Sequence, residues 1–183
     1  QTNLMSNFIS GTGRAVPTIV KKNSDFATSN FLDEEANPFP NEITEIIQKF
    51  SSITGIEERR YAPDNINSSD LAAEAGAKAI SDAGIDKESI DYIIVAHNFG
   101  DTPANAKHSE PLPSVAPKVK TIIGIVNPTC VAYDLVFGCP GWVEGLIQAN
   151  AFIKAGLAKR CLVIGADTLS SVVDPVDRDS MIF

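Results

Sequence analysis

The stretch VAYDLVFGCPGWVEGLIQANAFIKA, residues 131–155, decides the fold of this chain. Its first six residues are β-branched, aromatic or otherwise apolar apart from one aspartate, which predicts a strand. The run from Trp142 to Ala155 is long and apolar, which predicts a helix. Between the two, Cys139 has a glycine close on either side, so we expect one cysteine on a sharp turn from strand to helix.

A cysteine at a helix N-terminus is a candidate nucleophile. Unpaired N–H groups and the positive end of the helix dipole stabilise a thiolate there, and the thiolate is the reactive form. Pro140 fits the first helical turn because its missing N–H would have no partner in that position. A free cysteine is also among the most often buried residue types and then acts as an inert apolar side chain. The spacing alone therefore leaves both interpretations of Cys139 open.

The rest of the chain alternates strand-like and helix-like segments, which predicts an α/β layered fold with a mixed, largely parallel sheet. The helix after Cys139 leaves little polar face, so we expect it to be buried. Residues 30–41 and 98–117 are expected to be loops. The remaining predicted elements are a strand at Phe8–Gly13 and helices from Asn41 to Ser52 and from Asn67 or Ser68 to about Asp82.

Six stretches besides the cysteine turn occur in an order that is typical of one family. They are Ile9–Gly13 followed by Pro17, Thr54–Arg60, Asp91–Ala96, Pro113-Ser114, Val163–Asp167 and Asp174–Arg178. Together with the Cys139 turn, they resemble the N-terminal half of the β-ketoacyl-acyl-carrier-protein synthase III family, in the thiolase superfamily. This resemblance implies that Asp91–Ala96 is a core strand. The resemblance runs from about Phe8 to Phe183, and we expect residues 8–183 to form the N-terminal thiolase-like domain. Residues 1–7 are interpreted as a tag remnant and a disordered start.

This resemblance implies a condensing acyltransferase of fatty acid biosynthesis. Cys139 would form an acyl-cysteine, which would then condense with a malonyl thioester. Implied partners are acyl-coenzyme A or acyl-carrier protein, malonyl-acyl-carrier protein and a second copy of the chain, without cofactor or metal. Leu112 would line the acyl pocket of the partner, and Arg178 would meet the nucleotide end of coenzyme A. The family's His and Asn lie in its second half, so we expect this chain to be inactive alone.

Some residues depart from the family pattern. The Trp and Arg that sandwich the adenine in many members fall here on Lys49 and Ile53, which weakens the case for coenzyme A. His97 and His108 do not match family catalytic positions and are interpreted as loop residues. A type III polyketide, resorcinol-forming or hydroxymethylglutaryl-type synthase would share the cysteine turn. A noncatalytic synthase-like partner subunit and a binding domain with an inert Cys139 also remain open.

Composition narrows the class of protein further. The 183 residues are 44% hydrophobic and carry 15 Lys and Arg against 23 Asp and Glu, a net charge of -8. This charge argues against nucleic acid as a partner, and no apolar run is long enough to span a membrane. An acidic carrier protein would need a local basic patch, such as one around Arg59 and Arg60, or a docking surface in the second half. The three cysteines form neither a metal-ligand pattern nor a disulfide framework, which favours a cytoplasmic location.

Overall fold

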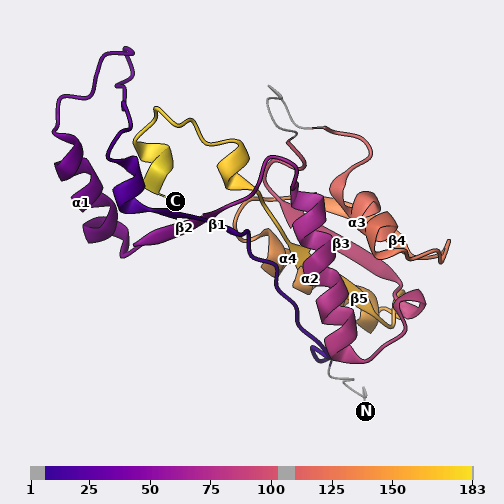
Figure 1. The fold of residues 1–183 in the computed structure, drawn as a ribbon. Coiled ribbons are helices and arrows are strands. Elements are labelled where there is room, and N and C mark those ends of the chain that lie inside the picture. Colours follow the sequence, from indigo (N-terminus) through magenta and orange to yellow (C-terminus); the bar gives the residue numbers. More distant parts are fainter. Residues whose placement is uncertain (1–6, 103–109, 183) are drawn as a thin grey trace. The chain divides into compact units, whose positions relative to one another are not determined.

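The computed structural model describes residues 7–102 and 110–182, and the chain divides into two compact units (Figure 1). Unit 1 comprises the described residues up to Val16 together with Asp64–Thr168. Unit 2 comprises Pro17–Pro63 and the described residues from Leu169 onward. No helix in the described part of the chain is long and apolar enough to cross a membrane.

Unit 1 is built around a parallel sheet of three strands. Their order is β4 (Val131–Val136), β3 (Tyr92–His97) and β5 (Cys161–Gly165), with β3 in the middle. Every residue of β3 from Ile93 to Val95 is fully buried, as expected for a strand covered on both faces. The predicted strands at 131–136 and 91–96 are therefore confirmed, and the carboxyl ends of all three strands meet at one edge of the sheet.

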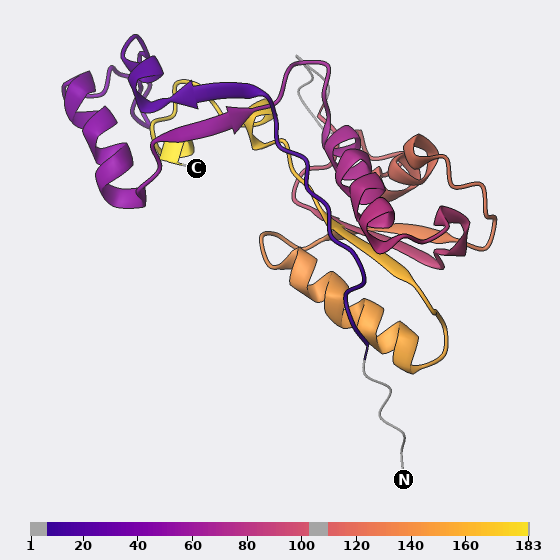
Figure 2. The ribbon, with the colours of Figure 1, turned by 60° about the horizontal axis from the view of Figure 1, so that its bottom comes forward.

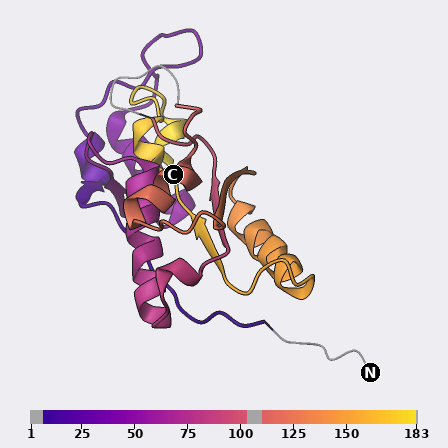
Figure 3. The same ribbon diagram turned by 90° about the vertical axis from the view of Figure 1, so that its right-hand side faces the viewer.

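Helices cover both faces of this sheet (Figures 2 and 3). On one face, α2 (Ser68–Ala83) and α3 (Val115–Ile123) form a common core with Ile93 and Val95. On the other face lies α4 (Gly141–Lys154), whose Gly145 allows close packing, since a Cβ there would lie 2.8 Å from Val163 Cγ1. The layered α/β prediction is thus confirmed in unit 1.

The ends of α2 follow from local sequence. Asn67 caps its N-terminus in an extended conformation, and the Asp70 side chain accepts from the Asn67 N–H at 2.9 Å. Gly84 ends the helix at a φ of 63°, a left-handed conformation that favours glycine. The predicted helix from Asn67 or Ser68 to about Asp82 is confirmed.

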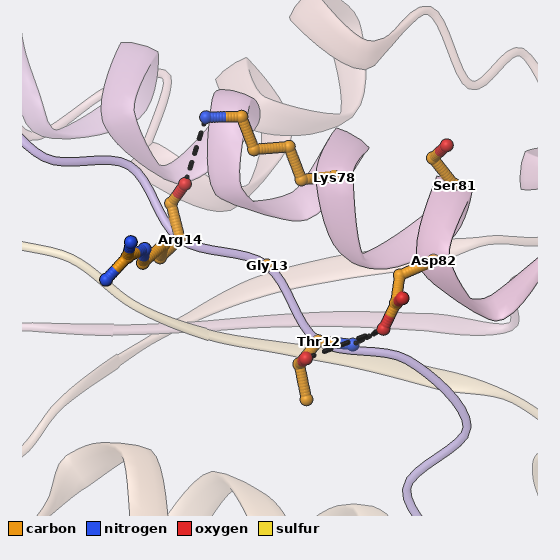
Figure 4. Close-up of a pocket in the computed structure, with 6 residues that line it drawn as sticks. All are labelled: Thr12, Gly13, Arg14, Lys78, Ser81 and Asp82. Atoms are coloured by element: carbon orange, nitrogen blue, oxygen red, sulfur yellow. Dashed lines mark hydrogen bonds between the residues drawn. The ribbon is translucent and has the colours of Figure 1, made fainter.

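The predicted first strand at Phe8–Gly13 is wrong, because this segment is extended but pairs with no strand of the described chain. It lies against α2 instead (Figure 4), where the Thr12 N–H donates to Asp82 Oδ2 at 2.8 Å. Lys78 Nζ donates to the Arg14 carbonyl at 3.1 Å. A Cβ on Gly13 would overlap the helix backbone, so glycine permits this close approach.

The prediction that α4 is buried is also wrong. The side of α4 that faces the sheet consists of small residues, with Gly141, Gly145 and Ala149 buried. Its bulky residues Trp142, Val143 and Ile147 are 45%, 53% and 56% exposed. Trp142 still contacts β5, where its Nε1 donates to the Val163 carbonyl at 3.4 Å. An apolar helix can therefore pack closely through small residues while much of the surface of its large side chains stays exposed.

Unit 2 holds a smaller core of aromatic residues. The strands β1 (Ile19–Lys22) and β2 (Glu58–Tyr61) pair antiparallel, and α1 (Ile43–Thr54) ends at Gly55 with a φ of 71°. This α1 confirms the helix predicted at 41–52, with both ends shifted by two residues. Short 3₁₀ helices span Asn23–Phe26, Leu169–Ser171 and Asp179–Ile182, while unit 1 has one at Lys87–Ser89. Core side chains include Phe26, Phe31, Ile46, Phe50 and Met181.

Candidate active site

Cys139 stands on the turn between β4 and α4, as predicted. The strand ends at Val136, and the thiol is exposed two residues before the first residue of the helix. Gly138 has a φ of 80°, and its carbonyl accepts from the Gly141 N–H at 2.9 Å. Pro140 forms the cap of α4 rather than part of its first turn. The strand, turn and helix are confirmed, whereas the role of Cys139 as nucleophile stays a prediction.

Backbone donors remain available beside this thiol. The Cys139 N–H donates no hydrogen bond to any residue that the structure describes, and α4 has no side-chain cap at its N-terminus. Free N–H groups at a helix N-terminus attract negative charge. The turn can therefore stabilise both a thiolate and an oxyanion that forms next to it.

The other two cysteines are poorer nucleophiles. Cys130 is buried, and burial raises the pKa of its thiol. Cys161 is half-buried at the start of β5, where burial and then the charge of Asp91 raise its pKa to about 11. Both thiols therefore stay protonated near neutral pH. Among the three cysteines, Cys139 is the exposed one.

Asn98 and Asp167 join the ends of β3 and β5 beside the cysteine turn. The Asn98 N–H donates to Asp167 Oδ1 at 2.9 Å, and its side-chain Nδ2 donates to Oδ2 at 2.6 Å. A Cβ on Gly138 would lie 3.6 Å from Asn98 Oδ1, so this amide faces the turn. Sequence reasoning missed Asn98, although its place directly after a predicted strand was a usable signal.

His97 is the last residue of β3 and is buried, so its interpretation as a loop residue is wrong. Its Nε2 lies 2.7 Å from Asp134 Oδ2 in β4. The same carboxylate accepts from the N–H groups of Val115 and Ala116 at 2.8 and 2.7 Å, at the start of α3. Burial opposes ionisation of Asp134, but these hydrogen bonds outweigh it and lower its pKa. An ionised Asp134 thus holds β3, β4 and α3 together behind the turn.

Two other predicted site residues lie elsewhere in the fold. Leu112 is 83% exposed and precedes α3 in unit 1. Arg178 belongs to unit 2, where its guanidinium lies 4.2 Å from the Phe39 ring centroid and 2.7 Å from an oxygen of Asp179. Their proposed roles toward substrate stay predictions.

The positions that depart from the family pattern also lie in unit 2. Lys49 forms an ion pair with Glu45 at 3.0 Å, and Ile53 is 68% exposed near the end of α1. Arg59 is buried beside Phe26 and Phe50, so it cannot contribute to the basic surface patch considered above. His108 lies outside the described residues, which contain no group of three acidic, histidine or cysteine side chains that could hold a metal.

Comparison with known proteins agrees with this geometry. Residues 133–183, which include Cys139, match the model of the 3-oxoacyl-[acyl-carrier-protein] synthase III family. A β-ketoacyl-[acyl-carrier-protein] synthase III of Vibrio vulnificus is 38% identical over 97% of this chain and 49% of its own length. The chain therefore spans about half the length of the curated relatives it matches.

Solved structures lead to the same family. The 3-oxoacyl-[acyl-carrier-protein] synthase III of Aquifex aeolicus superposes with a TM-score of 0.75 at 30% identity, over 95% of this chain and 49% of that one. The synthase III of Thermus thermophilus gives a TM-score of 0.71 at 33% identity, over 94% and 46%. The chain thus belongs to the β-ketoacyl-[acyl-carrier-protein] synthase III family, and its coverage fits the N-terminal half of that family's thiolase-like fold.

Proposed function

We propose that this chain is the N-terminal half of a condensing enzyme of fatty acid biosynthesis, a 3-oxoacyl-[acyl-carrier-protein] synthase III. The observation that carries the proposal is the exposed Cys139 on its turn before α4, with an N–H group that has no acceptor in the described chain. Family membership supports the same activity, because the relatives are named for it.

The first half-reaction uses groups of this chain. The Cys139 thiolate attacks the carbonyl carbon of an acyl thioester, and the carbonyl oxygen becomes an oxyanion. N–H groups at the turn stabilise that oxyanion, an effect typically worth about 3 kcal/mol per donor. Collapse of the intermediate expels the carrier thiolate, which takes up a proton, and leaves an acyl group on Cys139.

The second half-reaction needs groups from the second half of the protein. A His and an Asn there would assist loss of carbon dioxide from a malonyl thioester. The resulting carbanion attacks the acyl-cysteine carbonyl, forms the new carbon–carbon bond and releases the Cys139 thiolate. The product is a 3-oxoacyl thioester, and this division of groups explains why we expect the isolated chain to be inactive.

The proposal includes substrates and assembly. The primer is an acyl-coenzyme A or acyl-carrier protein, the extender is malonyl-acyl-carrier protein, and the enzyme works as a homodimer in the cytoplasm. The outer edge of β4 has no strand partner in the described chain, and the exposed Val131 and Val136 stand at its two ends. An unpaired strand edge with apolar ends supports pairing with a second copy.

Replacement of the nucleophile tests this function. In the full-length protein, Cys139→Ala should reduce formation of 3-oxoacyl product by about a thousandfold or more, because the covalent intermediate cannot form. Cys161→Ala is the matched control and should leave product formation nearly unchanged. Normal condensation by the Cys139→Ala protein would refute the assignment.

A further inference from the structure

Asn98 continues a row of β3 side chains that faces α4 and the turn before it. Each of three alternate residues, Ile94, Ala96 and Asn98, lies opposite a glycine of α4 or of its turn. A Cβ on Gly145 would lie 3.5 Å from Ile94, one on Gly141 would lie 3.1 Å from Ala96, and one on Gly138 would lie 3.6 Å from Asn98. The row thus moves along α4 toward its N-terminus. Its last member, Asn98, reaches the turn that carries Cys139.

Asp167 fixes which way the Asn98 amide points. The carboxylate accepts from Asn98 N–H and from Nδ2, so Nδ2 is the donor of this side chain. A flipped amide would bring two acceptors together, which is unfavourable. Oδ1 therefore faces Gly138, and it accepts no hydrogen bond within the described residues. The structure presents an oriented acceptor without a partner beside the nucleophile turn.

We propose that Asn98 Oδ1 accepts a hydrogen bond from the amide N–H nearest the sulfur of the thioester that acylates Cys139. In carrier thioesters that nitrogen is separated from the sulfur by two carbon atoms. Gly138 directly precedes Cys139, and consecutive Cα atoms are about 3.8 Å apart. The acceptor beside Gly138 therefore lies within reach of the carrier arm of a thioester that is bound at Cys139. The inference rests on the proposed function, which requires such a thioester.

The two sides of the turn would then have complementary tasks. N–H groups at the start of α4 donate to the carbonyl oxygen of the thioester, while Asn98 Oδ1 accepts from the amide N–H of the arm beyond the sulfur. Gly138 leaves open the space between the amide and the turn, since it has no Cβ. Recognition of the arm by a fixed acceptor positions the carbonyl carbon for attack by Cys139.

A matched pair of small thioesters tests this contact. Both carry the same acyl group; one is a thioester of N-acetylcysteamine, and the other is a thioester of 2-acetoxyethanethiol, in which an ester oxygen replaces the amide N–H. In the full-length protein, kcat/KM for acylation of Cys139 should be about tenfold higher with the amide, the size expected for one neutral hydrogen bond. Asn98→Leu should abolish this preference, so that the two thioesters acylate Cys139 with the same kcat/KM.

A second variant separates recognition from support of the turn. Asn98→Asp combined with Asp167→Asn keeps one donor and one acceptor between the two positions, and an acceptor still faces Gly138. This exchange should recover most of the preference for the amide. Alkylation of Cys139 by iodoacetamide at the wild-type rate shows in each variant that the turn is intact.

The outcomes are distinct. Equal losses with both thioesters in Asn98→Leu would mean that Asn98 only supports the turn, and the inference would be overturned. Equal acylation of the wild-type protein by both thioesters would also overturn it, while leaving the proposed function in place. Wild-type protein that is acylated by neither thioester would overturn the proposed function and the inference with it.

Discussion

Gly138 has the conformation that turns β4 into α4 at Cys139. Its φ of 80° costs a residue with a Cβ about 1–2 kcal/mol, and a Cβ there would meet Asn98 Oδ1 at 3.6 Å. We predict that Gly138→Ala lowers the free energy of unfolding by about that amount and slows acylation of Cys139 severalfold. Urea denaturation and the rate of acyl-enzyme formation measure the two effects.

Gly156 offers a matched control for this prediction. It has a φ of 73°, and a Cβ there would have open space within 4 Å. Gly156→Ala should therefore lose similar stability through backbone strain alone, about 1–2 kcal/mol, without slower acylation. Acylation of the Gly138→Ala protein at the wild-type rate would show that the shape of the turn does not matter.

The lowered pKa of the Asp134 carboxyl group predicts that the stability of the fold depends on pH. Its pKa is held below the ordinary 3.8 because hydrogen bonds from His97, Ala116 and Val115 outweigh the cost of burial. The unfolded chain therefore takes up this proton first as the pH falls. The stabilisation is complete above the ordinary pKa and is lost as the pH falls from there through the lower folded-state value.

The Asp134→Asn protein tests this dependence. At pH 7 the substitution should cost about 2 kcal/mol of unfolding free energy, because it removes a largely buried charge that accepts several hydrogen bonds. The difference from wild type should shrink as the pH falls below the ordinary value of 3.8. The exposed Asp64 provides a control, since Asp64→Asn should change stability by less than about 0.5 kcal/mol. A difference for Asp134→Asn that stays constant down to the lowest measurable pH would contradict the account.

At the scale of single residues, the sequence predicted the turn at Cys139 but not the side-chain contacts that support it. The turn at Cys139 depends on neighbouring residues, so glycine and proline chemistry indicated it. The support consists of contacts between residues far apart in the chain, such as Asn98 with Asp167 and His97 with Asp134. Without a sheet register, no local pattern identifies such partners.

Among the elements, α4 leaves an apolar face uncovered. Trp142, Val143 and Ile147 are about half exposed. We predict that the 183-residue chain self-associates through this face, because a patch of this kind is costly in water. Val143→Lys with Ile147→Lys should reduce association in light scattering without a large loss of stability. A monomeric wild-type chain would contradict this prediction.

Ile122 on α3 supplies the comparison, because it is 52% exposed on another helix. Ile122→Lys should leave association unchanged, since one exposed apolar side chain is ordinary on a protein surface. An equal effect of Ile122→Lys would mean that added charge, rather than the α4 face, prevents association.

The elements also show what sequence patterns can and cannot predict. Helix α2 was predictable because Asn67 and Gly84 mark its ends locally. The strand expected at 8–13 was not formed, since a strand needs a partner and the Thr12 N–H bonds to the Asp82 side chain instead. The apolar composition of α4 predicted a buried helix, but composition does not reveal which side of such a helix meets the sheet.

For the whole molecule, the chain spans about half the length of the curated relatives it matches. The cysteine and its backbone donors lie in unit 1, whereas the proposed His and Asn belong to the second half. We predict that the isolated 183-residue chain forms no 3-oxoacyl product from acyl and malonyl thioesters. Chromatography with mass detection measures that product, and its appearance above a heat-treated control would contradict the division of catalytic groups.

Formation of an acyl-cysteine at Cys139 is the central claim. Its most direct test is intact-mass and peptide-mass analysis of the full-length protein after incubation with acyl-coenzyme A and acyl-carrier-protein thioesters from acetyl to decanoyl. The account predicts a mass gain of one acyl group, confined to the peptide that contains Cys139 and absent from Cys139→Ala. No gain in folded protein whose Cys139 still reacts with iodoacetamide, or a gain that persists in Cys139→Ala, would contradict it.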